Sequence, residues 1–119
     1  MTDAPKPSTN PLRSQLAGDP DMAELIDLFV EELPKRIDSV VEAWRARELG
    51  TLQRLAHQLK GASAGYGFPT IGSAAAKVED NIRARPPEQV ELDQLGANVN
   101  QLIDLCRRAA PGFGIGKAA

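Results

Sequence analysis

The sequence contains few cysteine, histidine and aromatic residues, and it lacks a long hydrophobic run. Its 119 residues include one cysteine and one histidine, which excludes an internal disulfide and a zinc site built from His and Cys ligands. No hydrophobic stretch reaches the roughly 18 residues that a membrane crossing needs, and the N-terminus does not read as a secretory leader. We therefore expect a reducing, cytoplasmic location and no contact with a membrane.

The charge balance and the missing motifs exclude further classes of protein. A net charge of −2 argues against binding to nucleic acid, whose phosphates favour a basic surface. The sequence has no nucleophile elbow, Walker loop or dinucleotide-binding fingerprint. With three Phe, one Trp and one Tyr, the core must be mainly aliphatic, which suits packed helices. An enzyme with its own nucleotide site is therefore not expected.

The pattern of hydrophobic residues predicts an all-α protein of one domain. Residues 1–11 and 110–119 are rich in Pro, Gly and polar residues and are predicted to be disordered or flexible tails around a domain of residues 12–109. Within that domain, helical periodicity predicts four helices, which begin near Pro20, Leu49, Pro69 and Glu88. Short connections favour an antiparallel up-down four-helix bundle, with a helical hairpin that dimerises as the alternative.

Two residues stand out within these predicted helices. Pro34 lies inside the first segment and is predicted to kink it or split it in two. Cys106 falls in register with the last hydrophobic stripe, which indicates a packed small hydrophobe rather than a reactive thiol. The predicted core stripes are Met22, Ile26, Phe29, Leu33, Ile37, Val40 and Trp44; then Leu49, Leu52, Leu55, Ala56, Leu59, Ala62, Ser63 and Tyr66; then Ile71, Ala75, Val78 and Ile82; and finally Leu92, Leu95, Val99, Leu102 and Cys106.

The single histidine, His57, lies on the second predicted helix, opposite its hydrophobic face. At about 100° per residue its neighbours on the helical wheel are Gln53, Lys60, Gly61 and Ala64, so the ring is predicted to stand in solvent. Gly61 costs about 1 kcal/mol relative to alanine inside a helix, which indicates a reason for a small residue there. Gly61 and Ala64 lower the surface around the ring, and this clearing lets a partner protein approach closely.

The chemistry of these residues fits a covalent carrier of phosphate. A solvated imidazole, with a pKa of about 6.5, is largely neutral at pH 7 and can take a phosphoryl group as a nucleophile. Lys60 is placed to neutralise part of the added charge, and Gln53 to donate a hydrogen bond to a phosphate oxygen. No cluster of carboxylates near His57 in the sequence offers a metal site, which favours a carrier whose partners bring the catalytic groups.

The stretch "AHQLKGASAGYG" around His57 resembles the signature of histidine-containing phosphotransfer (HPt) domains, in which His-x-x-Lys-Gly precedes small residues. Segments on either side, such as "LFVEELPKRI" and "IGSAAAKVED", extend the resemblance over about residues 19–108. It implies a monomeric four-helix bundle in which His57 accepts phosphate through Nε2, with Lys60 and Gly61 as supporting residues. It also implies receiver domains and a hybrid or sensor histidine kinase as partners, and Mg²⁺ held by the receiver, with no cofactor of this chain.

Two other functions compete with this interpretation. One is the phosphoacceptor domain of a sensor histidine kinase, although Gln58 stands where an acidic residue usually follows the histidine. The other is a helical adaptor that docks signalling proteins without phosphotransfer, which leaves Gly61 unexplained. For a docking partner, Leu25, Leu28 and Phe68 are candidate contacts because they flank the predicted core stripes.

Overall fold

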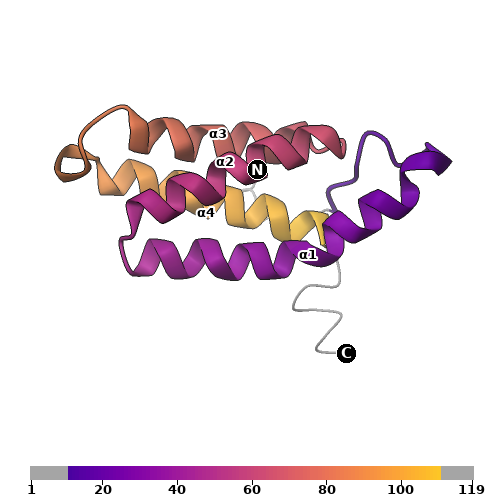
Figure 1. Ribbon diagram of the computed structural model, residues 1–119, viewed down its shortest axis with the longest axis horizontal. Helices are drawn as coiled ribbons and strands as arrows, with labels where there is room; N and C mark the ends of the chain where they lie inside the picture. Colours follow the sequence, from indigo (N-terminus) through magenta and orange to yellow (C-terminus); the bar gives the residue numbers. More distant parts are fainter. Residues whose placement is uncertain (1–10, 111–119) are drawn as a thin grey trace, which may run out of the picture.

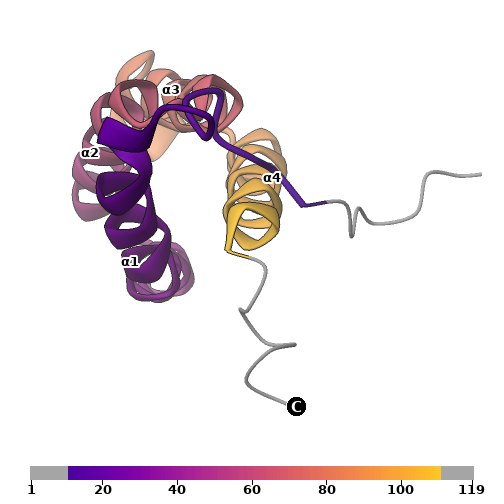
Figure 2. The same ribbon diagram turned by 90° about the vertical axis from the view of Figure 1, so that its right-hand side faces the viewer.

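The computed structural model describes residues 11–110 and contains four α-helices and one short 3₁₀-helix there, with no strand in that range. Figure 1 shows that successive helices run in opposite directions along the long axis, and Figure 2 shows the same helices end-on. The all-α prediction is confirmed. The elements are α1 (Pro20–Arg45), α2 (Leu49–Gly65), α3 (Pro69–Arg83), the 3₁₀-helix η1 (Pro87–Gln89) and α4 (Leu92–Ala109).

Local sequence signals set the start of α1 and the end of α2. The carboxylate of Asp19 accepts a hydrogen bond of 2.9 Å from the backbone N–H of Asp21, and Pro20 occupies the first helical turn. At the other end of α2, Gly67 adopts a φ of +83°, a left-handed conformation that glycine reaches without strain. These positions are the ones that the sequence predicts.

The first helix was predicted to be kinked or split at Pro34. Helix α1 is continuous through Pro34, so it is not split there, and the kink stays a prediction. Proline has no backbone N–H, so the hydrogen bond to the carbonyl of Val30 is missing. The helical turns on both sides of Pro34 continue the helix. Figure 1 shows that the N-terminal part of α1 projects beyond the ends of its neighbours. That projecting half carries side chains that no other helix fully covers.

The core is aliphatic and draws on all four helices, as the stripes predict. Each helix packs against two others in the order α1, α2, α3, α4 and back to α1. Cys106 is buried within it, and burial raises the pKa of its thiol to about 12, as expected for an inert packed residue. The largest fully buried aliphatic side chains are Leu33, Ile37 and Val40 of α1, Leu52 and Leu59 of α2, Ile71 and Val78 of α3, and Leu95, Val99 and Leu102 of α4.

The start of α4 differs from the prediction. The sequence placed it near Glu88, but η1 occupies that region and α4 begins at Leu92. Leu92 was assigned to the core stripe, yet 44% of its surface is exposed. It stands in the first turn of α4, where it lines an open hollow with Leu49 and Pro87, so its register with Leu95 does not bury it.

The segment before α1 contacts the C-terminal ends of α2 and α4. The N–H of Leu12 donates to the carbonyl of Arg108, and the N–H of Gln15 donates to the carbonyl of Gly67, both at 2.8 Å. The hydroxyl of Ser14 donates to the carbonyl of Tyr66 at 2.6 Å. Figure 2 shows the segment crossing the end of the bundle between α4 and α1. It therefore ties the end of α2 to the end of α4.

The predicted tails fall almost entirely outside the described residues. Of their members that are described, Pro11 is exposed, whereas Ala110 is 4% exposed and caps α4. Among the helices of residues 11–110, none combines the length and the apolar character that crossing a bilayer demands.

Candidate functional site

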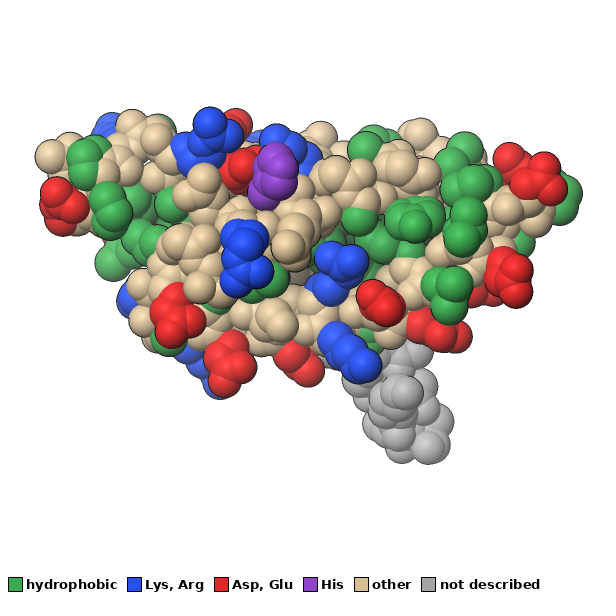
Figure 3. Space-filling model, viewed as in Figure 1, with side chains coloured by type: hydrophobic (Ala, Val, Ile, Leu, Met, Phe, Trp, Pro, Cys, Tyr) green, Lys and Arg blue, Asp and Glu red, His purple; other side chains and the backbone are tan. Residues whose placement is uncertain are grey.

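His57 stands on the outer face of α2, as the helical wheel predicts. Its side chain is 63% exposed, while Leu52, Ala56 and Leu59 on the opposite face are buried. Figure 3 shows the histidine at the surface beside acidic and basic side chains. The ring is therefore open to a partner and is also held by contacts within the protein.

The ring is held by Glu79 of α3, which the sequence analysis did not identify. Glu79 Oε2 lies 2.8 Å from His57 Nδ1, at hydrogen-bonding distance. The carboxylate is 3% exposed because Glu79 falls between Val78 and Ile82 on the face of α3 that packs on α2. Helix packing thus positions the carboxylate below the ring.

Two cations share the same carboxylate. Lys60 Nζ lies 2.9 Å from Glu79 Oε1, and Arg83 Nη1 lies 3.6 Å from Oε2. Lys60 was predicted to neutralise part of the charge of a phosphorylated ring, and this role stays a prediction. In the unmodified protein Lys60 is an ion-pair partner of Glu79. Arg83 was not identified from the sequence. Both cations remain partly exposed, at 41% and 61%, so each can also reach solvent.

This arrangement keeps Glu79 ionised. Lys60, acting chiefly through its short contact, lowers the pKa of Glu79; burial opposes this shift and His57 adds to it. An ionised carboxylate can only accept a hydrogen bond. The proton in the contact with His57 therefore belongs to Nδ1, and in the neutral ring the lone pair is then on Nε2. With Nδ1 occupied by this contact, Nε2 is the ring nitrogen that does not face Glu79.

The other predicted site residues surround His57 without touching the ring. Gly61 and Ala64 are exposed, and a Cβ placed on Gly61 would meet nothing within 4 Å. Packing within the protein therefore does not require glycine at that position. Gln53 is half-buried, and no hydrogen bond within residues 11–110 joins it to His57. The role predicted for Gln53 stays a prediction.

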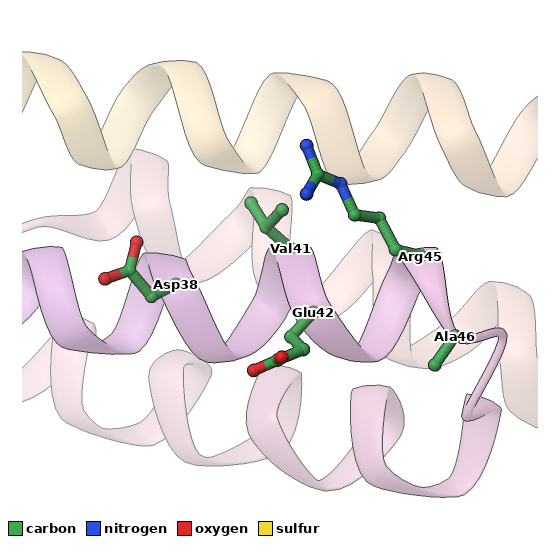
Figure 4. Close-up of a pocket in the computed structure, with 5 residues that line it drawn as sticks. All are labelled: Asp38, Val41, Glu42, Arg45 and Ala46. Atoms are coloured by element: carbon green, nitrogen blue, oxygen red, sulfur yellow. The ribbon is translucent and has the colours of Figure 1, made fainter.

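The neighbourhood of His57 is a surface site rather than a ligand pocket. The hollow shown in Figure 4 lies on the C-terminal half of α1, away from His57, and its side chains point to different sides of the helix. Within residues 11–110, no group of three or more His, Cys, Asp or Glu side chains is placed to hold a metal ion. The residues that line the hollow are Asp38, Val41, Glu42, Arg45 and Ala46.

The fold and this site define a small helical domain that presents an accessible histidine held by a buried carboxylate. Comparison with protein families matches residues 24–108 to the Hpt domain. The chain therefore belongs to the Hpt domain family, whose members are phosphocarrier modules of phosphorelays. Comparisons with curated proteins and with solved structures give no significant match.

Proposed function

We propose that His57 is the phosphoacceptor of a phosphorelay intermediate. It takes a phosphoryl group from the aspartyl-phosphate of one receiver domain, or from a histidine kinase, and passes it to the aspartate of a response-regulator receiver domain. The observation that carries this proposal is the 2.8 Å contact between His57 Nδ1 and the buried Glu79. It holds an accessible ring in the tautomer that attacks through Nε2.

On this chain, the imidazole of His57 is the group that forms the bond to phosphorus. The Nε2 lone pair forms a bond to phosphorus as the bond from phosphorus to the aspartyl oxygen breaks, and the carboxylate leaves with those electrons. The proton on Nδ1 stays on the ring, where Glu79 offsets the positive charge that the ring acquires. In the reverse step, an aspartate oxygen attacks phosphorus and the neutral imidazole is restored.

The surroundings of His57 support exchange between proteins. Lys60 and Arg83 place positive charge beside a phosphoryl group that carries close to two negative charges. Gly61 and Ala64 leave the approach low for the rim of a receiver site. We place Mg²⁺ on the receiver domain, and we propose that this chain acts as a cytoplasmic monomer without kinase activity of its own.

Phosphorylation by a labelled phospho-receiver with Mg²⁺ tests the assignment. Wild-type protein is expected to gain acid-labile, base-stable label, and ³¹P–¹⁵N NMR is expected to locate phosphorus on Nε2. The variant His57→Gln is expected to gain none while its circular dichroism stays helical. A matched control is His57→Gln/Gln58→His, which keeps one exposed histidine on α2 but moves it away from Glu79.

The control separates a placed histidine from any surface histidine. Label on the shifted histidine at the wild-type rate would show that contact with Glu79 is irrelevant. Label that persists in His57→Gln would remove the assignment. Receiver binding without any label on wild type would favour the alternative function, a docking adaptor without phosphotransfer, for which two exposed leucines on α1 are the supporting observation.

A further inference from the structure

The N-terminal half of α1 carries two large hydrophobic side chains that the fold leaves exposed. Leu25 is 44% exposed and Leu28 is 56% exposed, although Ile26 and Phe29 between and beside them are buried. Leu25 and Leu28 are three residues apart, so they are neighbours on the surface of the helix. Phe68, the third docking candidate, is 2% exposed and is therefore a core residue.

The leucine pair is surrounded by acidic residues. Between residues 14 and 34 the sequence has six Asp and Glu residues and no Lys or Arg. Three of them, Glu24, Glu31 and Glu32, are one helical turn from Leu28, and all three are exposed. An apolar centre with a rim of one charge is the composition of a protein-binding surface.

This acidic leucine surface is defined by Leu25, Leu28 and the acids around them, and its half of α1 contacts the C-terminal end of the helix that carries His57. The ring of Phe29 stacks on Tyr66 at the end of α2 with 5.1 Å between centroids, which joins this half of α1 to the helix of His57. Figure 3 shows hydrophobic side chains over the N-terminal part of α1 on the same face as the histidine. Along α2 toward that end, Gly61 and Gly65 leave open space above the helix.

The charge changes sign between the two places. Around His57 stand Lys60, Arg83 and, one turn earlier on α2, the exposed Arg54. The charged residues within one turn of Leu28 are all acidic, and one of them, Glu32, lies 4.0 Å from Arg36 on the next turn. A partner that covers both must match an electropositive centre and an electronegative flank at once.

We propose that the acidic leucine surface docks the receiver domain and sets its orientation over His57, which rests on the proposed function. The receiver that fits has its aspartate opposite the basic surroundings of His57 and an apolar patch rimmed by Lys and Arg opposite Leu25 and Leu28. Opposite polarity at the two contacts permits one orientation and repels the reversed one. In this arrangement the leucines contribute most of the binding energy, and the carboxylates select the orientation of the receiver domain.

Transfer kinetics test the surface separately from the chemistry of His57. The protein is loaded with phosphoramidate, a small donor that needs no docking, and is then discharged to the receiver domain that reacts fastest within a purified panel. Leu25→Ala/Leu28→Ala is expected to lower the second-order rate constant of discharge by about tenfold or more, with loading unchanged. Leu92→Ala is the matched control, since Leu92 is equally exposed but lies at the start of α4.

The charge arm uses Glu24→Gln/Glu31→Gln, with Glu88→Gln in η1 as its control. The first is expected to slow discharge by a few-fold at low salt and to weaken its salt dependence, since rim charges act mainly on the association rate. Failure of wild type to load or to discharge would sink the proposed function itself. Wild-type discharge that the leucine variant matches would overturn the docking surface alone. A wild-type dimer that Leu25→Ala/Leu28→Ala converts to monomer would also overturn it, because the occupant would be a second copy.

Discussion

Replacement of Lys60 by methionine is expected to destabilise the domain more than replacement of its partner Glu79 by glutamine. The asymmetry follows from burial, since Glu79 is 3% exposed whereas the side chain of Lys60 is 41% exposed. Without Glu79, the freed ammonium turns to water at little cost. Without Lys60, the carboxylate stays covered and keeps only His57 at 2.8 Å and Arg83 at 3.6 Å. The buried carboxylate of Glu79 thus depends on Lys60 more than Lys60 depends on Glu79.

The size of the effect follows from the same contacts. Removing one partner of a fully buried ion pair costs about 3 to 5 kcal/mol. The side chains that cover Glu79 are themselves 41% to 63% exposed, so water enters when Lys60 is shortened. We therefore expect Lys60→Met to lower the free energy of unfolding by about 1 to 2 kcal/mol, which is the scale of one lost hydrogen bond to a charged group. Glu79→Gln is expected to cost about 1 kcal/mol or less, close to that of a partly exposed pair.

The ion pair also makes the stability of the domain depend on pH, in a direction set by the pKa shift of Glu79. Contacts with Lys60 and His57 place the pKa of Glu79 in the folded protein below its ordinary value of 4.5. A depressed folded pKa contributes stability that is present above about pH 4.5 and is lost as pH falls through the folded pKa. In Lys60→Met the leading cause of the depression is gone and the burial that raises the pKa remains. The gap in stability between wild type and Lys60→Met should therefore narrow as pH falls below about 4.5.

Urea unfolding followed by circular dichroism at pH 7 and at pH 4 measures both quantities. Lys77→Met serves as the control, because Lys77 is an exposed lysine of α3 with no ion pair among residues 11–110. The double variant Lys60→Met/Glu79→Gln should recover most of the loss, since no buried charge is left unpaired. If Lys60→Met is as stable as Lys77→Met at pH 7, the carboxylate does not depend on Lys60 and the reasoning fails.

Two glycines give further predictions. Gly61→Leu should slow transfer to a receiver by tenfold or more in a discharge assay while leaving the urea midpoint equal or higher, because a Cβ there meets nothing within 4 Å; undiminished transfer would discredit the clearing around His57. Gly67→Ala should lower the free energy of unfolding by about 2 kcal/mol, because φ is +83° and the new Cβ would collide with Ser14 Oγ. Gly65→Ala, with open space around its Cβ, should cost nothing in the same urea titration, and an equal loss in both variants would contradict the strain argument.

The sequence predicted the helices and the placement of His57 because both follow from local periodicity. Helix α2 begins and ends where the pattern places it, and the face opposite its leucines is the exposed one. The Glu79 contact could not be found the same way, since it joins residues 22 apart through the packing of α2 on α3. A signal was nevertheless present, because Glu79 is one turn from Ala75 and Ile82 on the hydrophobic face of α3. A carboxylate in core register requires a partner, and His57 and Lys60 were available on α2.

The remaining errors have physical causes at the ends of helices. Leu92 has the right spacing for the core, but η1 delays α4 so that Leu92 sits in an uncovered first turn. Phe68 was proposed for docking, but it stacks on Phe29 with 5.6 Å between ring centroids and closes the core at the turn after α2. Spacing along one helix predicts which face a residue shares, whereas neighbouring elements decide whether that face is covered.

The 2.8 Å hydrogen bond between Leu12 and Arg108 brings the first and the last residues of the described domain side by side. A module whose two ends meet can be spliced into a surface loop of a host protein without forcing the host's chain apart. The same closeness makes circular permutation feasible, with new termini opened in the connection between α1 and α2. This geometry suits insertion of the domain into a larger protein, because the cores of both can then stay unchanged.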